Sequence, residues 1–189
     1  GDPIETSRQG GERLIELRVM PGFRERPRLA LYDVLVGAVH EDPHGLEGLA
    51  EIDLLANRIA VFVDHALGTG MGHLPDMGLG LAVACPDRKV LILNGDGSML
   101  MNLGVLVSIA NTAPRNLILF VFENEIYEVT GGQPIPGRGR TNFAAMAKGA
   151  GFAHTFEFAE LSAFDKELPN ILTLDGPVFV TIQAGSSGK

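Results

Sequence analysis

The feature that most limits how this chain can fold is a regular alternation of short apolar runs with segments of helical pattern. The runs at residues 90–93 and 117–122 are almost continuously apolar. A strand that is apolar at every position is buried on both faces, which is typical of a parallel sheet, because helical connections cover both of its faces. The alternation therefore predicts an α/β fold with a doubly wound, mainly parallel sheet and helices on both faces.

The pattern also predicts the order of the remaining elements. Further strands are expected at 59–63, 153–158 and 178–183, and helices at 29–39, 46–57, 77–85, 99–111, 142–149 and 161–168. Glycine and proline mark the segments between them, with a break at 43–45, a turn at 68–72 and a loop at 131–140. No internal repeat interrupts this order.

The chain is long enough for one sizeable core. It has 189 residues, of which 46% are hydrophobic and 20% are charged, and this is too short for two full α/β domains. Residues 1–28 mix glycine, proline and both signs of charge, so we expect them to form an N-terminal arm or irregular lead-in. Residues 29–189 are expected to form a single domain.

Charge and cysteine content exclude several classes of function. The net charge of −8 disfavours a nucleic-acid-binding face. No apolar run approaches the ~18 residues needed to cross a bilayer, and the first residues do not resemble a secretory signal, so we expect a cytoplasmic protein without membrane contact. The single cysteine, Cys85, excludes an internal disulfide and any multi-cysteine metal site, and we expect it to be a small buried hydrophobe.

The residues that point to chemistry follow the run at 90–93. Gly95, Asp96 and Gly97 form a tight turn that opens a helix. Ligands of open α/β sheets bind at the carboxyl ends of strands, where the N-terminus of the next helix offers N–H groups to an anion. The glycines allow close approach of the backbone, and Asp96 is placed to hold a hard cation such as Mg²⁺. Asn124 follows the next apolar run, and we expect it to lie near Asp96 and to complete an oxygen-rich metal site with a backbone carbonyl.

These residues carry a resemblance to a known family. Gly95-Asp96-Gly97, then residues 98–123, then Asn124 resembles the signature of enzymes that use thiamine diphosphate (ThDP), specifically of their C-terminal, diphosphate-binding domain. Met71, 25 positions before Asp96 (96 − 71 = 25), matches the bulky residue that holds the cofactor in a bent shape. The resemblance further implies that the backbone carbonyl of Thr69 accepts a hydrogen bond from the pyrimidine amino group.

Two further segments narrow the resemblance. Residues 127–134, Tyr-Glu-Val-Thr-Gly-Gly-Gln-Pro, and residues 143–151 are similar to the β subunit or domain of sulfopyruvate and phosphonopyruvate decarboxylases. This implies a ThDP- and Mg²⁺-binding subunit of a 2-oxoacid decarboxylase, a carboxy-lyase. Two alternatives remain open: a non-catalytic ThDP-type scaffold or cofactor-binding protein, and another ThDP enzyme such as an acetolactate synthase-like C–C ligase or lyase.

The resemblance also implies the roles of individual residues. The metal ligands are Asp96, Asn124 and the backbone carbonyl of Ile126, and His73 is the candidate catalytic residue of this chain. The sequence departs from the family at Glu123 and Glu125, where smaller or less acidic residues are usual. The cofactor-binding residues are Thr69, Gly70, Met71, Gly95, Asp96, Gly97, Ser98, Asn124, Ile126 and Tyr127.

A partner follows from the same resemblance. Family members activate ThDP with a glutamate that lies on a separate pyrimidine-binding domain, and the roughly 60 residues before the motif region are too few for such a domain. We therefore expect a β subunit of a split enzyme, or a piece of a fused one. It is expected to form a hetero-oligomer such as α2β2 with a pyrimidine-binding subunit, or a homodimer when isolated, and to act on a small 2-oxoacid.

Other motifs have weaker support. Residues 68–72 resemble the start of a dinucleotide-binding fingerprint, but His73 stands where its third glycine belongs. His40 and His44 match a zinc-protease pattern, but Pro43 disfavours the helix that the pattern needs. Arg138 and Arg140 lie in the glycine-rich loop, where they are candidates to bind an anionic part of the substrate.

Overall fold

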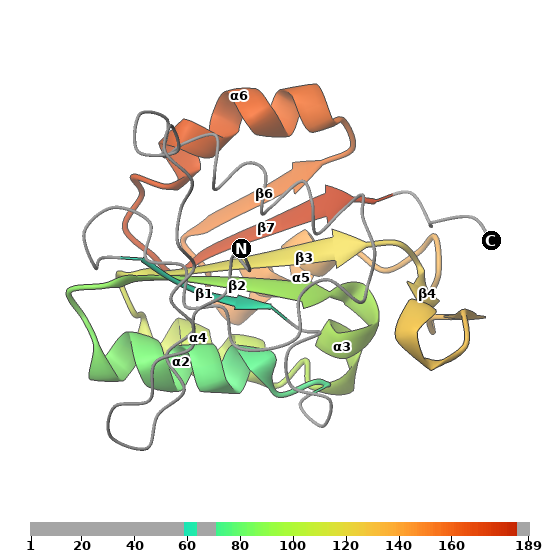
Figure 1. The fold of residues 1–189 in the computed structure, drawn as a ribbon, viewed down its shortest axis with the longest axis horizontal. Helices are drawn as coiled ribbons and strands as arrows, with labels where there is room; N and C mark the ends of the chain where they lie inside the picture. The colour runs from blue at the N-terminus through green and yellow to red at the C-terminus, as the bar shows by residue number, and fades with distance from the viewer. Residues whose placement is uncertain (1–58, 64–70, 185–189) are drawn as a thin grey trace, which may run out of the picture.

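The computed structural model describes residues 59–63 and 71–184 (Figure 1). Several sequence-based expectations lie outside these residues: the arm at 1–28, the helices at 29–39 and 46–57, the histidine pair His40 and His44, and the cofactor-binding candidates Thr69 and Gly70. In the described part of the chain, no helix combines the length and the apolar character that crossing a lipid bilayer requires.

The predicted parallel sheet is present. Its strands are β1 (Ile59–Val63), β2 (Lys89–Gly95), β3 (Leu117–Glu123), β6 (His154–Phe158) and β7 (Val178–Gln183). They are ordered β1-β2-β3-β7-β6, and each neighbouring pair is parallel. All strands therefore end at one edge, on the right in Figure 1.

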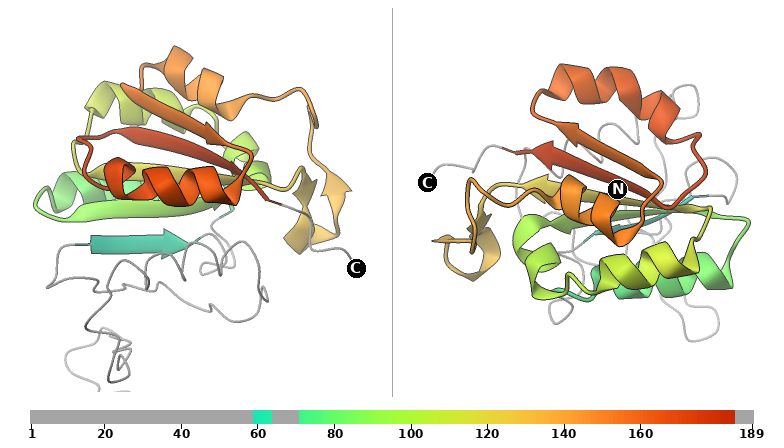
Figure 2. Two further views of the ribbon diagram at one scale, coloured as in Figure 1. Left: turned by 90° about the horizontal axis from the view of Figure 1, so that it is seen from above. Right: turned by 180° about the vertical axis from the view of Figure 1, so that it is seen from behind.

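Helices cover both faces of this sheet, as the continuous apolar runs indicate. The helices α2 (Leu74–Ala84), α3 (Asp96–Met101), α4 (Val105–Thr112) and α5 (Phe143–Ala150) share one core cluster with β2 and β3. On the opposite face lies α6 (Leu161–Ile171) (Figure 2).

The direction of the chain explains this distribution. Up to β6 each crossover moves the chain in one direction along the sheet, whereas the connection from β6 to β7 moves it back. Because parallel crossovers are right-handed, reversing the direction places the connecting helix on the other face.

The core consists of one apolar layer on each side of the sheet. Alternate residues of a strand point to opposite faces, so β2 and β3 supply both layers. The layer under α6 contains Leu91, Leu93, Ile118, Phe120, Phe164, Leu168, Ile171, Val178, Val180 and Ile182. The layer under the other helices contains Leu74, Ala82, Val90, Ile92, Met99, Val105, Leu106, Ile109, Leu117, Leu119, Val121, Phe143, Ala147, Phe152 and Phe179.

The structure corrects three helix predictions. The predicted helix at 99–111 is two helices, because the chain leaves helical geometry at Asn102, whose side chain donates to Asp76 Oδ2 at 2.7 Å. The helix predicted at 77–85 begins earlier, at Leu74, with Pro75 in its first turn. Proline is tolerated there because N–H groups of the first turn have no partner within the helix. The helix predicted at 161–168 continues through Pro169 to Ile171, whose side chain is fully buried.

Two further expectations are also corrected. Cys85 is only half-buried, because it lies at the C-terminal end of α2 rather than on its core face. The segment predicted as a loop at 131–140 contains β5 (Gln133–Pro134), which pairs antiparallel with β4 (Ile126–Tyr127). A short 3-10 turn at Glu128–Thr130 connects the two strands. This hairpin stands beyond the carboxyl ends of the sheet (Figure 1).

Candidate functional site

The turn after β2 places one carboxylate at the edge of the sheet where the strands end. Asp96 begins α3 directly after the last residue of β2, and its side chain is 2% exposed. One carboxylate oxygen, Oδ1, accepts a hydrogen bond from the Gly97 N–H at 2.7 Å. The other, Oδ2, accepts one from the Glu125 N–H, also at 2.7 Å. Asp96 thus connects the ends of β2 and β3.

The surroundings of Asp96 favour binding of a cation. Burial raises the pKa of Asp96, while the backbone N–H groups of Glu125, Gly97 and Asn124 lower it in part. Burial acts against the ionised form because protein solvates a charge less well than water does. A divalent cation beside this carboxylate would supply the missing stabilisation.

Asn124 lies at the same edge, as predicted. It follows the last residue of β3, which is the neighbour of β2 in the sheet. Its Oδ1 accepts a hydrogen bond from the Ile126 N–H at 3.2 Å, and its Nδ2 donates to Glu128 Oε2 at 2.9 Å. These bonds fix the amide, so that its oxygen is the atom available as a metal ligand.

Gly97 brings the hairpin close to the start of α3. A Cβ atom at Gly97 would lie 2.6 Å from Cδ1 and 2.7 Å from Cε1 of the Tyr127 ring, and 3.6 Å from Cγ2 of Ile135. Real Cβ atoms essentially never come within 3.0 Å of other atoms, so the ring leaves no room for a Cβ, while the distance to Ile135 is an ordinary contact. Glycine is therefore needed here for the packing of the Tyr127 ring. Both Gly97 and Tyr127 are predicted to contact the cofactor.

The predicted residues before α2 also reach this region. The Gly72 N–H donates to Ser98 Oγ at 2.9 Å, which ties the segment around half-buried Met71 to the first turn of α3. The φ angle of Gly72 is +88°, and a Cβ there would lie 2.9 Å from Met101 Cβ. Met71, Gly95, Asp96, Gly97, Ser98, Asn124, Ile126 and Tyr127 are thus gathered around the ends of β2 and β3.

His73 lies on the surface beside this group. Its side chain is 70% exposed, and its Nδ1 is 3.3 Å from Asp76 Oδ2. The same Asp76 oxygen accepts the bond from Asn102. A catalytic role for His73 stays a prediction, since an exposed histidine with an acidic neighbour is equally suited to a structural contact.

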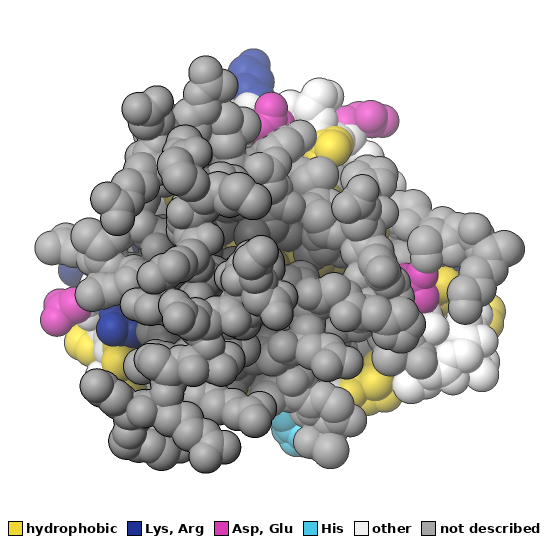
Figure 3. Space-filling model, viewed as in Figure 1, with side chains coloured by type: hydrophobic (Ala, Val, Ile, Leu, Met, Phe, Trp, Pro, Cys, Tyr) yellow, Lys and Arg dark blue, Asp and Glu magenta, His cyan; other side chains and the backbone are white. Residues whose placement is uncertain are grey.

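The edge of the sheet carries further acidic groups. The pKa of Glu123 is raised to about 7, chiefly by burial and also by the negative charges of Glu157, Asp96 and Glu125, while a hydrogen bond with Thr181 acts in the opposite direction. On the face seen in Figure 3, acidic side chains are visible at the right-hand end, toward which the strands point, as well as at the left-hand end and the top. This negative field favours a cation over an anion as the first ligand of the site.

Sequence reasoning missed the role of Glu125. Its carboxylate accepts hydrogen bonds from Arg138 Nε at 3.0 Å and from the Gly139 N–H at 2.9 Å. Arg138, a candidate for binding an anionic substrate group, is thereby paired with a carboxylate of its own chain. The one sequence signal for this contact is the pair of glycines that flank Arg138, because glycine allows a tight turn. Both adopt positive φ angles, +76° at Gly137 and +68° at Gly139.

The donor set has the composition that suits magnesium. Among the described residues, no group of three or more His, Cys, Asp or Glu side chains is arranged to hold a metal ion. The oxygen donors that the turn offers are the Asp96 carboxylate, the amide oxygen of Asn124 and nearby backbone carbonyls. Mg²⁺ is bound in this way in proteins, by one or two carboxylates together with water and phosphate oxygens.

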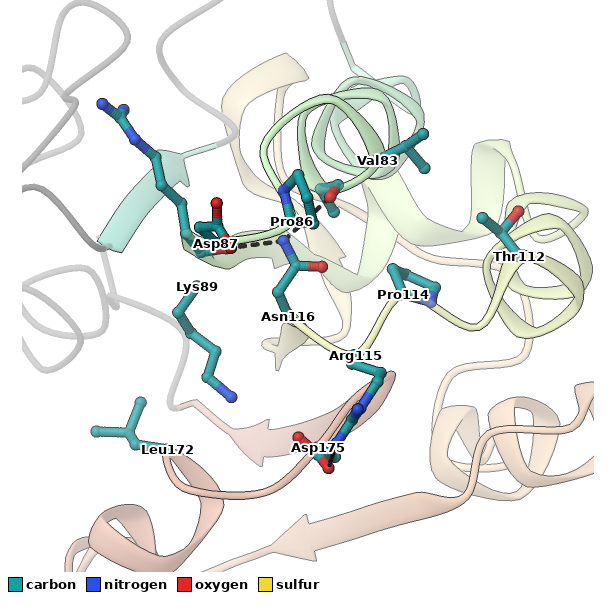
Figure 4. A pocket seen from close by; sticks show the side chains of 12 residues that line it. Val83, Pro86, Asp87, Lys89, Thr112, Pro114, Arg115, Asn116, Leu172 and Asp175 are labelled. Carbon is teal, nitrogen blue, oxygen red and sulfur yellow. Dashed lines mark hydrogen bonds and ion pairs between the residues drawn. The ribbon is translucent and has the colours of Figure 1, made fainter.

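A groove of about 830 Å³ lies at the opposite edge, around the amino ends of β2 and β3 (Figure 4). Several of the polar groups that line it have partners within the chain. Lys89 Nζ donates to the Leu174 carbonyl at 2.7 Å, burial lowers its pKa, and Arg115 forms an ion pair with Asp175. Asn116 Nδ2 donates to the carbonyl oxygens of Ala82, Cys85 and Arg88 at 3.0, 3.0 and 2.7 Å. These contacts stabilise the fold and do not form a second candidate site.

Comparison with known proteins gives consistent matches. The family model described as thiamine pyrophosphate enzyme, C-terminal TPP binding domain, matches residues 50–182. The β subunit of sulfopyruvate decarboxylase from Methanocaldococcus jannaschii is 43% identical over 108 residues, which cover 57% of this chain and 56% of that protein. Phosphonopyruvate decarboxylase from Streptomyces viridochromogenes is 35% identical over 118 residues, which cover 61% of this chain and 29% of that protein.

A solved structure shows the same fold. The 2-oxoglutarate:ferredoxin oxidoreductase from Magnetococcus marinus superimposes with a TM-score of 0.53 at 21% sequence identity, over 61% of this chain and 45% of that one. The chain spans little more than half the length of the Methanocaldococcus β subunit.

Proposed function

Because this chain belongs to the family of C-terminal TPP-binding domains of thiamine pyrophosphate enzymes, we propose that it binds ThDP and Mg²⁺ and forms part of a 2-oxoacid decarboxylase. The substrate class follows from the sulfopyruvate and phosphonopyruvate decarboxylases to which it is similar. Both of those substrates are small 2-oxoacids that carry a second anionic group.

The observation that carries this proposal is the arrangement around Asp96. Its buried carboxylate lies between the ends of β2 and β3, with Asn124 on the adjacent strand. In the proposed site, Asp96, the Asn124 amide oxygen and the Ile126 carbonyl hold Mg²⁺, which in turn binds the diphosphate. Burial makes Asp96 a stronger partner for the ion than an exposed carboxylate, because little water competes for either charge.

Other residues of the chain hold the cofactor. In the proposed site the backbone at Gly95, Gly97 and Ser98 contacts the diphosphate, and the Tyr127 ring, which lies against Gly97, closes the site from the hairpin side. Met71 is proposed to support the bent cofactor, with Thr69 and Gly70 contributing backbone contacts that lie outside the described residues. When bound, ThDP supplies the nucleophilic carbon that adds to the 2-oxo group and accepts the electrons released with CO₂.

We also propose that a second chain completes the active site. The similar sulfopyruvate decarboxylase proteins are named β subunits, and the activating glutamate is expected on a pyrimidine-binding partner. Exposed hydrophobic side chains on α2 and on the segment from α3 to α4 support an interface. They are Met77, Val83, Met101 and Val107, which are 41%, 58%, 54% and 60% exposed.

Calorimetric titration tests the cofactor site. We expect ThDP to bind in the presence of Mg²⁺ and not in the presence of a chelator. Asp96→Asn should reduce the affinity at least about tenfold, because it removes the charge that holds the metal. Asp165→Asn makes the same change at an exposed position of α6 and should have no effect. Binding that is independent of both Mg²⁺ and Asp96 would contradict the proposal.

A glycine pair tests the close approach at the turn. Gly97→Ala forces the Tyr127 ring to move and should weaken ThDP binding, whereas a Cβ at Gly80 meets nothing within 4 Å. Gly80→Ala should leave binding unchanged and stabilise α2 by roughly 0.5–1 kcal/mol, because alanine favours a helix more than glycine does. Equal binding by the two variants would remove Gly97 from the site.

A further inference from the structure

Glu125 has a backbone conformation that its residue type disfavours. Its φ angle is +62°, and in the described part of the chain the other non-glycine residue with positive φ is Ala113. This left-handed region is natural for glycine and uncommon for a residue with a longer side chain. If the turn after Asn124 only had to reverse the chain, glycine would fit it better.

The side chain of Glu125 explains why glutamate stands there. Glu125 forms hydrogen bonds with two separate segments, the turn at Asp96 and residues 135–139. Its N–H donates to Asp96 Oδ2, while its carbonyl accepts from the Ile135 N–H at 3.1 Å. Its carboxylate accepts from Arg138 Nε and from the Gly139 N–H. The main chain of Glu125 is thus bound to the metal-binding turn and to Ile135, and its side chain to residues 138–139.

The segment that Glu125 holds has its own fixed shape. The Gly137 carbonyl accepts from the N–H groups of Arg140 and Thr141, and the positive φ angles of Gly137 and Gly139 allow this tight turn. Ile135, at the other end of the segment, is 4% exposed and packs toward Gly97. Segment 135–139 therefore lies against the turn of Asp96 at its Ile135 end. It is attached to Glu125 at both ends, through the Glu125 carbonyl at Ile135 and through the carboxylate at residues 138–139.

We propose that Glu125 is a positioning residue that fixes segment 135–139 against the metal-binding turn. This inference rests on the proposed function, since it concerns the same site. Glu125 acts through Asp96 and Arg138 rather than on a substrate. It keeps its N–H directed at Asp96 Oδ2, and its carboxylate pairs with the positive charge of Arg138. The prediction is that cofactor affinity depends on the Glu125 side chain although that side chain is not a metal ligand.

Amide hydrogen exchange of the full chain, without metal or cofactor, tests the attachment itself. Glu125→Gly removes the side-chain bonds and relieves the unfavourable φ angle. We expect exchange at Gly139 and Ile135 to become about tenfold faster, the effect of losing one hydrogen bond of ordinary strength. A role confined to backbone shape predicts the opposite, namely unchanged or slower exchange, and that result would overturn the proposal.

Two further variants separate the contributions. Glu125→Gln keeps an acceptor for the Gly139 N–H but loses the charge, so exchange should rise less than in Glu125→Gly. Arg138→Gln removes the ion pair and should resemble Glu125→Gln. The matched control is Arg140→Gln, which changes the exposed arginine directly after the segment. It should leave exchange at Gly139 and Ile135 as in the unmodified chain.

Titration of ThDP with Mg²⁺ distinguishes failure of this inference from failure of the proposed function. We expect about tenfold weaker binding by Glu125→Gly and partial recovery in Glu125→Gln. Equal binding by Glu125→Gly and the unmodified chain would overturn the positioning role and leave the proposed function intact. If the unmodified chain binds no ThDP, the proposed function fails, while the exchange data still decide whether Glu125 fixes the segment.

Discussion

Asp96 and Glu123 are neighbouring carboxyl groups that differ in the hydrogen bonds that oppose the effect of burial on their pKa. Asp96 is almost inaccessible, but backbone N–H groups from three residues partly offset the effect of its burial on its pKa. Glu123 has one opposing hydrogen bond, with Thr181, and its pKa rises to about 7. Backbone donors therefore favour charge on Asp96, the proposed ligand, and leave Glu123 nearer to neutral.

This difference gives a prediction for the pH dependence of stability. Glu123 titrates near 4.5 when unfolded and at about 7 when folded. Between these values the folded state binds more protons, so its stability falls as the pH rises from 4.5 to 7. Glu123→Gln should remove this fall and make the protein more stable at pH 8, by about 1 kcal/mol once solvent screening is allowed for.

The measurement is denaturant unfolding at pH 5 and pH 8 of metal-free and cofactor-free protein. The charged neighbours that face Glu123 are Glu157 on β6, Asp96 and Glu125. A Glu167→Gln variant makes the same change in α6 and should leave the pH profile as it is. An identical fall in stability for Glu123→Gln and the unmodified chain would show that Glu123 does not cause it.

At this scale the sequence predicts the positions of polar residues better than it predicts their contacts. Asp96 and Asn124 could be identified because each directly follows an apolar run, and parallel strands bring such positions together. The position of Glu125 could not, because its role depends on a left-handed φ angle and on bonds to residues 138 and 139, 13 and 14 positions away. Neither leaves a periodic signal in the sequence.

Among the secondary-structure elements, strands were predicted more accurately than helix boundaries. The strands at 59–63 and 178–183 have the predicted bounds, since apolar runs define them directly. The division between α3 and α4 was not predicted, because residues 99–111 are compatible with one helix. What divides them is tertiary: Asn102 donates to Asp76 at the start of α2.

We predict that the hydrogen bonds of Asn116, which connect the start of β3 to the end of α2, stabilise the fold. Its Nδ2 donates to three carbonyl oxygens in and after the end of α2, and it is 9% exposed. Asn116→Asp replaces this donor with an anion that faces the same three carbonyls. We expect a loss of about 2–3 kcal/mol of unfolding free energy, because buried acceptors lose their partner.

Thermal or denaturant unfolding checks this expectation, with Asn111→Asp as the matched control. Asn111 lies on the exposed side of α4, so the same charge change there should alter the unfolding free energy by less than about 0.5 kcal/mol. A similar loss in both variants would attribute the effect to added charge rather than to the bonds of Asn116.

At the scale of the whole molecule, the surface of α2 and of the α3–α4 segment stands out among the described residues because it carries little charge. No charged residue occurs at 77–84 or at 97–112, and four large hydrophobic side chains are exposed there. We predict that the isolated chain self-associates through this surface when its expected partner is absent. The paired substitutions Met101→Lys and Val107→Lys should shift it toward monomer.

Sedimentation velocity over a range of concentrations measures this equilibrium. Met146→Lys places a charge at a similarly exposed methionine on α5 and should not change the association. An unmodified chain that is monomeric at every concentration would contradict the prediction, and loss of association in Met146→Lys alone would place the interface on α5.

The groove around Lys89 and the turn at Asp96 lie at opposite ends of β2, which has seven residues. At about 3.3 Å per residue the two ends are roughly 20 Å apart, beyond the range over which the effects of substitutions usually couple. Changes at the two ends should therefore act additively on stability. Evolution, or a protein engineer, can then alter the ligand-binding end at a cost in stability and compensate with substitutions at the other end, without touching the cofactor site.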